Sequence, residues 1–159
     1  MNYDTLHGVS VSAQAVANAV IRMASEEGRK LTNMQVQKHV FLGHGYCLAL
    51  LDRPLYHNHT HAWQWGPVVP KLYKALQKYG SGEVTEEISA QDELDIASDD
   101  YRVLRGVWNA YRTYSGPQLS ELTHRPNTPW SKTWEAQKFG IIPDEDIQAY
   151  YKDRISSRA

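Results

Sequence analysis

Cysteine is nearly absent from this sequence, since Cys47 is the only one among 159 residues. A lone cysteine cannot form an internal disulfide, and it cannot supply the thiolates of a Cys-based zinc finger. It stands in a helical pattern beside Leu48, which indicates a buried core thiol. A catalytic thiol would need a base nearby in space, and His44, three residues earlier on a largely buried helix, is weak support for one.

Long apolar runs are also missing. The longest uninterrupted run spans Tyr46 to Leu51, far short of the ~20 residues that cross a bilayer. Nothing resembles a signal peptide. We therefore expect a cytoplasmic protein without a membrane segment, and a chain of 159 residues with 42% hydrophobic content fits a single domain over residues 1–159.

Phosphate-binding loops do not occur either, because the sequence contains neither GxGxxG nor GxxxxGK[ST]. His39 and His44 are five residues apart, which is the wrong separation for a helical zinc pair, so we expect both to make core or surface hydrogen bonds. The sequence thus predicts no catalytic residue, no cofactor and no enzyme.

One histidine pattern leaves an alternative open. His57, His59 and His61 alternate, and in a single extended strand they would share one face and could bind zinc. Asn58 and Thr60 favour a turn between them, which would separate the rings. We therefore predict no metal site, and a metal-dependent enzyme using these three histidines remains the second alternative function.

Most of the chain has helical periodicity. The second predicted helix follows a Thr32/Gln35 capping box and is apolar on several faces, Leu50 included, so we expect it to be the buried central helix. Gly43 and Gly45 within it predict close packing by a backbone or a bulky ring. The predicted helices cover residues 12–28, 32–51, 69–80, 99–114, 117–124 and 144–153.

From residue 54 to residue 64 this periodicity disappears. Residues 55–57 and 61–63 read as two short strands around a turn at 58–60. The expected fold class is therefore mainly α: a single compact helical domain of about six helices, with a small β-hairpin before the Gly-Pro turn.

The stretch WQWGPVVPKLY, residues 63–73, joins that hairpin to a helix. Pro67 and Pro70 are tolerated only at a turn or in the first turn of a helix. Five tryptophans and ten tyrosines suit a protein-binding surface, although most of them will be core. The Lys71, Lys74 and Lys78 face could instead contact phosphates, so a DNA-binding or autoregulatory module is the first alternative. A pI near 6.6 lacks the strong positive field of a DNA-binding protein, which argues against nucleic acid as a partner.

Acidic residues are concentrated in residues 79–101, which hold eight of them and no base. Such a segment is typical of a solvated, mobile loop. The alternative is an acidic arm that touches a basic partner.

Four blocks carry a resemblance to a known family. They are KLTNMQVQKHVFLGHGYCLALLDRPLYHN at 30–58, AWQWGPVVPKLY at 62–73, LSELTHRPNTPW at 119–130 and IIPDEDIQAYY at 141–151. In this order they resemble the Panacea antitoxin family, which includes SocA-like proteolytic adaptors and many phage-associated proteins. The resemblance covers residues 13–151. It implies an antitoxin that binds a cognate protein toxin directly, or tethers it to a cellular protease.

The resemblance and the aromatic content together suggest which residues contact the partner. We expect Trp65, Lys71, Tyr73 and Lys74 near the Gly-Pro turn. His124 and Trp130 either line the same groove or brace it; His124 could instead be a buried ring bonded to the loop backbone around residues 127–128.

This sequence also departs from the family pattern in two places. His61 stands where an acidic residue is expected, and Tyr56 stands where Phe is usual. The first departure changes the charge beside the proposed surface, so the partner could differ, and a phage-borne version could counter a host defence toxin.

Overall fold

The structure is a computed structural model, and it describes residues 10–157. The described residues form seven α-helices, one 3₁₀ turn and one small sheet, so the expected mainly α fold is confirmed. None of the helices in this range is long and apolar enough to cross a membrane. The elements are α2 (Ala13–Glu26), α3 (Asn33–Leu51), β1 (Thr60–Trp63), β2 (Gly66–Val68), α4 (Pro70–Leu76), η1 (Gln77–Tyr79), α5 (Asp99–Tyr111), α6 (Gly116–Thr123), α7 (Pro129–Ala136), β3 (Ile141–Ile142) and α8 (Asp144–Ser156).

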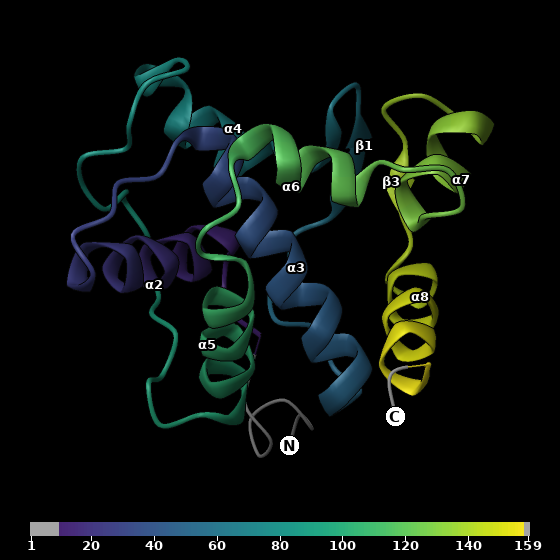
Figure 1. Cartoon of the computed structure of the whole chain (residues 1–159), viewed down its shortest axis with the longest axis horizontal. Coiled ribbons are helices and arrows are strands. Elements are labelled where there is room, and N and C mark those ends of the chain that lie inside the picture. The colour runs from purple at the N-terminus through teal and green to yellow at the C-terminus, as the bar shows by residue number, and fades with distance from the viewer. Residues whose placement is uncertain (1–9, 158–159) are drawn as a thin grey trace.

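Helix α3 is the centre of the fold, as expected. It contacts α2, α5, α6 and α8, and in Figure 1 it crosses the middle of the molecule between α5 and α8. The capping box of Thr32 and Gln35 starts it, and thirteen of its nineteen residues are buried. Burial does not reach the last turn, where Leu50 is 54% exposed.

The two glycines of α3 admit close neighbours. A Cβ on Gly45 would lie 2.5 Å from the ring of Tyr151, and one on Gly43 would lie 2.7 Å from Leu104. Both distances are too short for real atoms, so α8 and α5 approach α3 as closely as they do only because these side chains are absent. The prediction of close packing is confirmed.

The two histidines of α3 behave differently. His44 accepts hydrogen bonds at Nδ1 from the backbone N–H groups of residues 55 and 56, and its Nε2 lies 2.8 Å from Asp144 Oδ1. Since Nδ1 accepts, Nε2 carries the proton and donates to Asp144. The expectation for His39 was wrong: neither of its ring nitrogens has a hydrogen-bond partner among the described residues, because it packs against Trp108 in the core. Burial lowers the pKa of His39 to about 4.

The hairpin exists, but not where we placed it. Its strands are β1 and β2, with the turn at residues 64–65, and β1 also pairs with β3 in the order β2-β1-β3. Residue 56 forms only an isolated bridge with Val11. The turn residue Asn58 accepts a hydrogen bond from Ala13 N, so it serves the start of α2 rather than a hairpin.

Helix α7 was not predicted. Its N-cap, Thr128, forms a capping box with Ser131, and Pro129 occupies the first turn. Threonine followed by proline and a polar residue at the third helical position is an ordinary helix start. The helix is only eight residues long, which is too short for periodicity to stand out.

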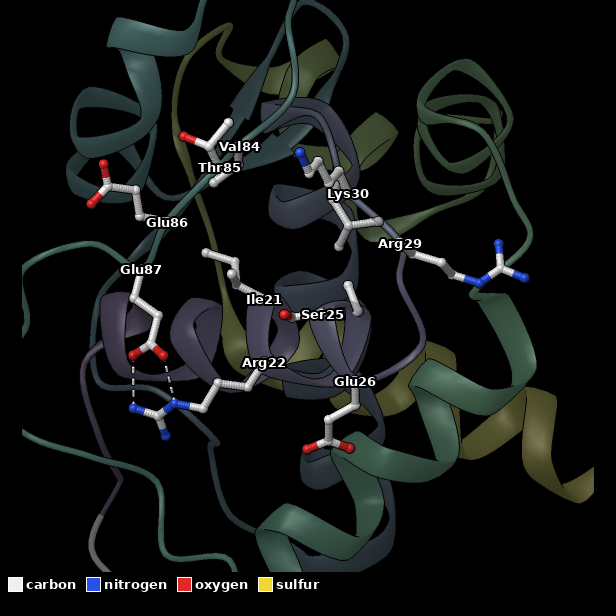
Figure 2. Close-up of a pocket in the computed structure, with 12 residues that line it drawn as sticks. Ile21, Arg22, Ser25, Glu26, Arg29, Lys30, Val84, Thr85, Glu86 and Glu87 are labelled. Atoms are coloured by element: carbon white, nitrogen blue, oxygen red, sulfur yellow. Dashed lines mark hydrogen bonds and ion pairs between the residues drawn. The ribbon is translucent and has the colours of Figure 1, made fainter.

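The acidic segment packs against α2, so the mobile-loop prediction was wrong. Asn18 bonds both the N–H and the C=O of Ile88 at 2.8 Å, and Val84 and Leu94 are buried. Six of its eight acids make hydrogen bonds or ion pairs within the chain. Figure 2 shows one of these, the Arg22–Glu87 pair, at the edge of a pocket between α2 and the segment.

Candidate functional site

A groove of about 630 Å³ lies between the N-terminal half of α3, the β1–β2 hairpin and α4. Its volume falls in the range of about 300–1,000 Å³ that is usual for ligand sites. Three aromatic side chains that line it are open to solvent: Trp65 is 60% exposed, Phe139 58% and Tyr73 37%. Its main lining residues are Met34, Lys38, Trp63, Trp65, Tyr73 and Phe139.

The hairpin beside the groove is fixed from the side of α6 and α7. The indole N–H of Trp130 donates to the Trp63 carbonyl at 2.7 Å. The hydroxyl of Ser120 donates to the Trp65 carbonyl at 2.5 Å. One bond goes to the residue before the turn and the other to the turn itself, so the turn backbone is held while the Trp65 side chain remains exposed.

The same hairpin is fixed from the side of α3. The Lys38 ammonium donates to the Pro67 carbonyl at 3.0 Å, and the Gln37 side chain accepts from Val69 N at 3.4 Å. Pro67 lacks an N–H, which is acceptable because β2 is an edge strand. Gly66 has φ of +123°, and a Cβ there would lie 3.1 Å from Lys38 Cε. The Gly-Pro pair therefore lets the hairpin approach α3 closely.

Lys38 is the main electrostatic feature of the groove. Its side chain is buried, with 2% of the residue exposed. No ion pair joins it to a carboxylate within residues 10–157. Burial, which disfavours the charged ammonium, lowers the pKa of Lys38 to about 7.

Two of the predicted contact residues, Trp65 and Tyr73, line this groove. The Tyr73 ring meets Trp63 edge to face, with centroids 5.0 Å apart. Lys71 and Lys74 are exposed on α4 and do not line it. Whether any of these side chains contacts a partner stays a prediction.

His124 and Trp130 lie behind the hairpin. Trp130 is 8% exposed and stacks on Trp134, and the His124 ring meets it at 5.2 Å edge to face. His124 Nδ1 donates to the Ser120 carbonyl, one turn earlier on α6, rather than to the 127–128 loop. Neither residue is among those that line the groove; Trp130 bonds the hairpin backbone, and His124 packs against Trp130.

Lys38, Trp63 and Phe139 are groove residues that we did not predict. The sequence did contain an indication of Lys38, because it lies in a helix that is apolar on several faces and is expected to be buried. Lysine is seldom fully buried unless it has a partner. Phe139 has no such signal. It reaches the groove because the residues before β3 bond to Ala62 of β1, an arrangement that depends on the sheet.

The structure does not gather the three alternating histidines. His57 and His59 are exposed, and only His61 lies in a strand, where its Nδ1 donates to the Phe139 carbonyl at 3.1 Å. Across residues 10–157, no three His, Cys, Asp or Glu side chains are placed to hold a metal ion. The zinc alternative therefore has no geometric support in that range.

Comparison with known proteins gives one family. Residues 36–131 match the family described as antitoxin SocA-like, Panacea domain. One similar protein is antitoxin SocA from Caulobacter vibrioides (strain NA1000 / CB15N), which is 29% identical over 130 residues, or 76% of this chain and 69% of that protein. No solved structure matches the chain. The matched range contains Lys38 and the whole β1–β2 hairpin.

Proposed function

This protein belongs to the antitoxin SocA-like, Panacea domain family, and we propose on that basis that it is an antitoxin. It neutralises a cognate protein toxin by direct binding, and it does so as a binding protein rather than as an enzyme. The contact surface is the groove, with the aromatic side chains beside it. The mechanism is occlusion, in which the antitoxin covers the substrate site of the toxin.

One observation carries this proposal: an exposed tryptophan on a rigid turn. Large exposed aromatics are the usual anchors of protein interfaces. Trp65 is 60% exposed, although the backbone on both sides of it is hydrogen-bonded to α3, α6 and α7. Because the turn is already ordered, little conformational entropy is lost when a partner binds it.

The remaining predicted residues take secondary roles. Tyr73 extends the aromatic surface, and the exposed Lys71 and Lys74 lie next to it on α4, where they provide a positive rim. Rim charges of this kind raise association rates more than affinity. His124 and Trp130 act indirectly, because Trp130 bonds the hairpin that presents Trp65 and His124 packs against Trp130.

Co-expression tests the proposal. The chain is expressed with the product of the neighbouring open reading frame, and growth and co-elution of the purified proteins are measured. We expect growth to be restored and a stable complex to form. Toxicity that persists at high levels of this chain, with no complex, would contradict the antitoxin role. A toxin whose level falls only when a cellular protease is present would indicate the adaptor mechanism instead of occlusion.

A matched pair of variants tests the surface. Trp65→Ala should weaken the complex on the order of 30-fold or more, as interface tryptophans commonly do. Leu50→Ala is the control, because Leu50 is also an exposed large apolar residue but lies at the opposite end of α3. Equal affinities for the two variants would place the contact surface elsewhere.

A further inference from the structure

We infer that the groove recognises a carboxylate of the protein partner: an acidic side chain of the toxin, next to an apolar one, pairs with the Lys38 ammonium. This inference rests on the proposed function and names the chemistry of its contact. The observations that point to it are the burial of Lys38, its incomplete hydrogen bonding and the aromatic walls around it.

The ammonium of Lys38 has unused hydrogen-bonding capacity. A lysine ammonium carries three N–H donors. Among the described residues, the one hydrogen-bond acceptor of Lys38 Nζ is the Pro67 carbonyl. A buried ammonium without a carboxylate is costly, and an anion that entered the groove would offset that cost.

A purely structural role does not explain a lysine at this position. The neighbouring Gln37 fixes Val69 with an uncharged amide, and an amide or hydroxyl could bond the Pro67 carbonyl in the same way. An uncharged side chain would also avoid the cost of burying an ammonium. The charge therefore serves something other than the hydrogen bond to Pro67.

The surroundings of Lys38 distinguish this groove from the pocket in Figure 2. That pocket also contains charged side chains, but its Arg22 is already paired with Glu87 at 2.8 Å. In the groove, no carboxylate within residues 10–157 pairs with Lys38, and the walls include Trp63, Trp65 and Tyr73. Aromatic walls around one buried cation suit a segment that combines an apolar side chain with a carboxylate.

A pair of small probes tests the carboxylate preference. The probes are 3-phenylpropanoate and its neutral amide, 3-phenylpropanamide, titrated to millimolar concentrations at pH 7 with tryptophan fluorescence and calorimetry as readouts. We expect the carboxylate to bind the wild-type protein on the order of tenfold more tightly than the amide, because hydrogen bonds to charged groups are the stronger ones. Lys38→Met should remove this preference. Lys152→Met, which changes an exposed lysine on α8 beside Asp52, away from the groove, should keep it.

A second readout needs no variant. In wild-type protein with ¹³C-labelled lysine, the carboxylate should raise the pKa of Lys38, whereas the amide should leave it unchanged. Equal binding of the two probes, binding of neither, or a preference that survives in Lys38→Met would overturn the inference.

The toxin complex tests the source of the carboxylate. Lys38→Met should weaken the complex on the order of tenfold or more relative to Lys152→Met. Wild-type affinity in Lys38→Met would overturn the inference and leave the antitoxin role intact. If the probes show the preference while the toxin affinity is unchanged, the groove serves a small carboxylate, which also contradicts the inference. Absence of any complex with the wild-type chain would instead refute the proposed function, and the probes alone would then decide whether the groove binds a carboxylate.

Discussion

The buried ammonium of Lys38 should make the protein less stable at neutral pH than a variant without it. Burial lowers the pKa of Lys38 from 10.5 to about 7. Each pKa unit corresponds to about 1.36 kcal/mol, so the charge costs about 4 kcal/mol of folding free energy at pH 7. Lys38→Met removes this cost and loses a hydrogen bond worth about 1 kcal/mol. We expect the variant to be about 3 kcal/mol more stable at pH 7.

The sign of the pH dependence provides a sharper check. Between pH 7 and 10.5 the unfolded chain keeps the Lys38 proton while the folded chain releases it, so wild-type stability rises with pH. Between pH 7 and 8.5 the rise from this residue is about 2 kcal/mol. Lys38→Met lacks it, so the advantage of the variant should shrink by that amount.

Urea denaturation of both proteins at pH 7.0, 7.5, 8.0 and 8.5 measures this difference. The range stops at 8.5 because burial raises the pKa of Cys47, Tyr56 and Tyr151 in the folded chain. At higher pH these groups would ionise increasingly in the unfolded chain only, and their ionisation would lower stability. Taking the difference between variant and wild type cancels their contributions. A variant that is less stable than wild type at every pH, by a constant amount, would refute the reasoning and show that Lys38 is well solvated or paired.

Three further predictions concern the core, the turn and the acidic segment. Burial lowers the pKa of His39 to about 4, so as pH falls the unfolded chain takes up a proton on His39 before the folded chain does. Between pH 7 and 5 the free energy of unfolding of the wild type should therefore fall by about 2 kcal/mol relative to that of His39→Leu, as measured by urea denaturation. Gly66→Ala should lower the stability of the protein by about 1–3 kcal/mol, because φ is +123° at this residue. The control Gly106→Ala, in an open position on α5, should instead raise stability by about 0.5–1 kcal/mol. Thermal melts that rank the two variants alike would contradict this. Asn18→Ala removes the hydrogen-bond partner of the Ile88 N–H and C=O and should make residues 83–98 the first site of limited proteolysis. An unchanged digestion pattern would mean that other contacts hold the segment.

Local patterns in the sequence were sufficient for most of the helices. The Thr32/Gln35 capping box and the apolar faces of α3 predicted both its start and its central position, because capping and periodicity depend on residues within a few positions of one another. Gly43 and Gly45 likewise predicted close contact, although they could not say that Leu104 and Tyr151 would provide it.

Contacts between distant residues decided the rest. Asn58 was expected to form a turn, but it bonds Ala13 instead, and the hairpin forms five residues further on. The acidic segment was expected to be mobile, but Asn18 holds its backbone against α2. In each case the hydrogen-bond partner lies far along the chain, 45 residues away for Asn58 and 70 for Asn18, so only the fold determined the contact.

The sequence by itself determined the family, the mainly α architecture and the start of a helix at the Gly-Pro stretch. These depend on residue types and on spacings that are short along the chain. Only the tertiary structure decided that Trp130 bonds the hairpin backbone and that Lys38 is buried beside the hairpin with one hydrogen-bond acceptor in the described range. The burial of a charge is a property of everything that surrounds it, and α3, the hairpin and α6 meet at Lys38 only in the folded chain.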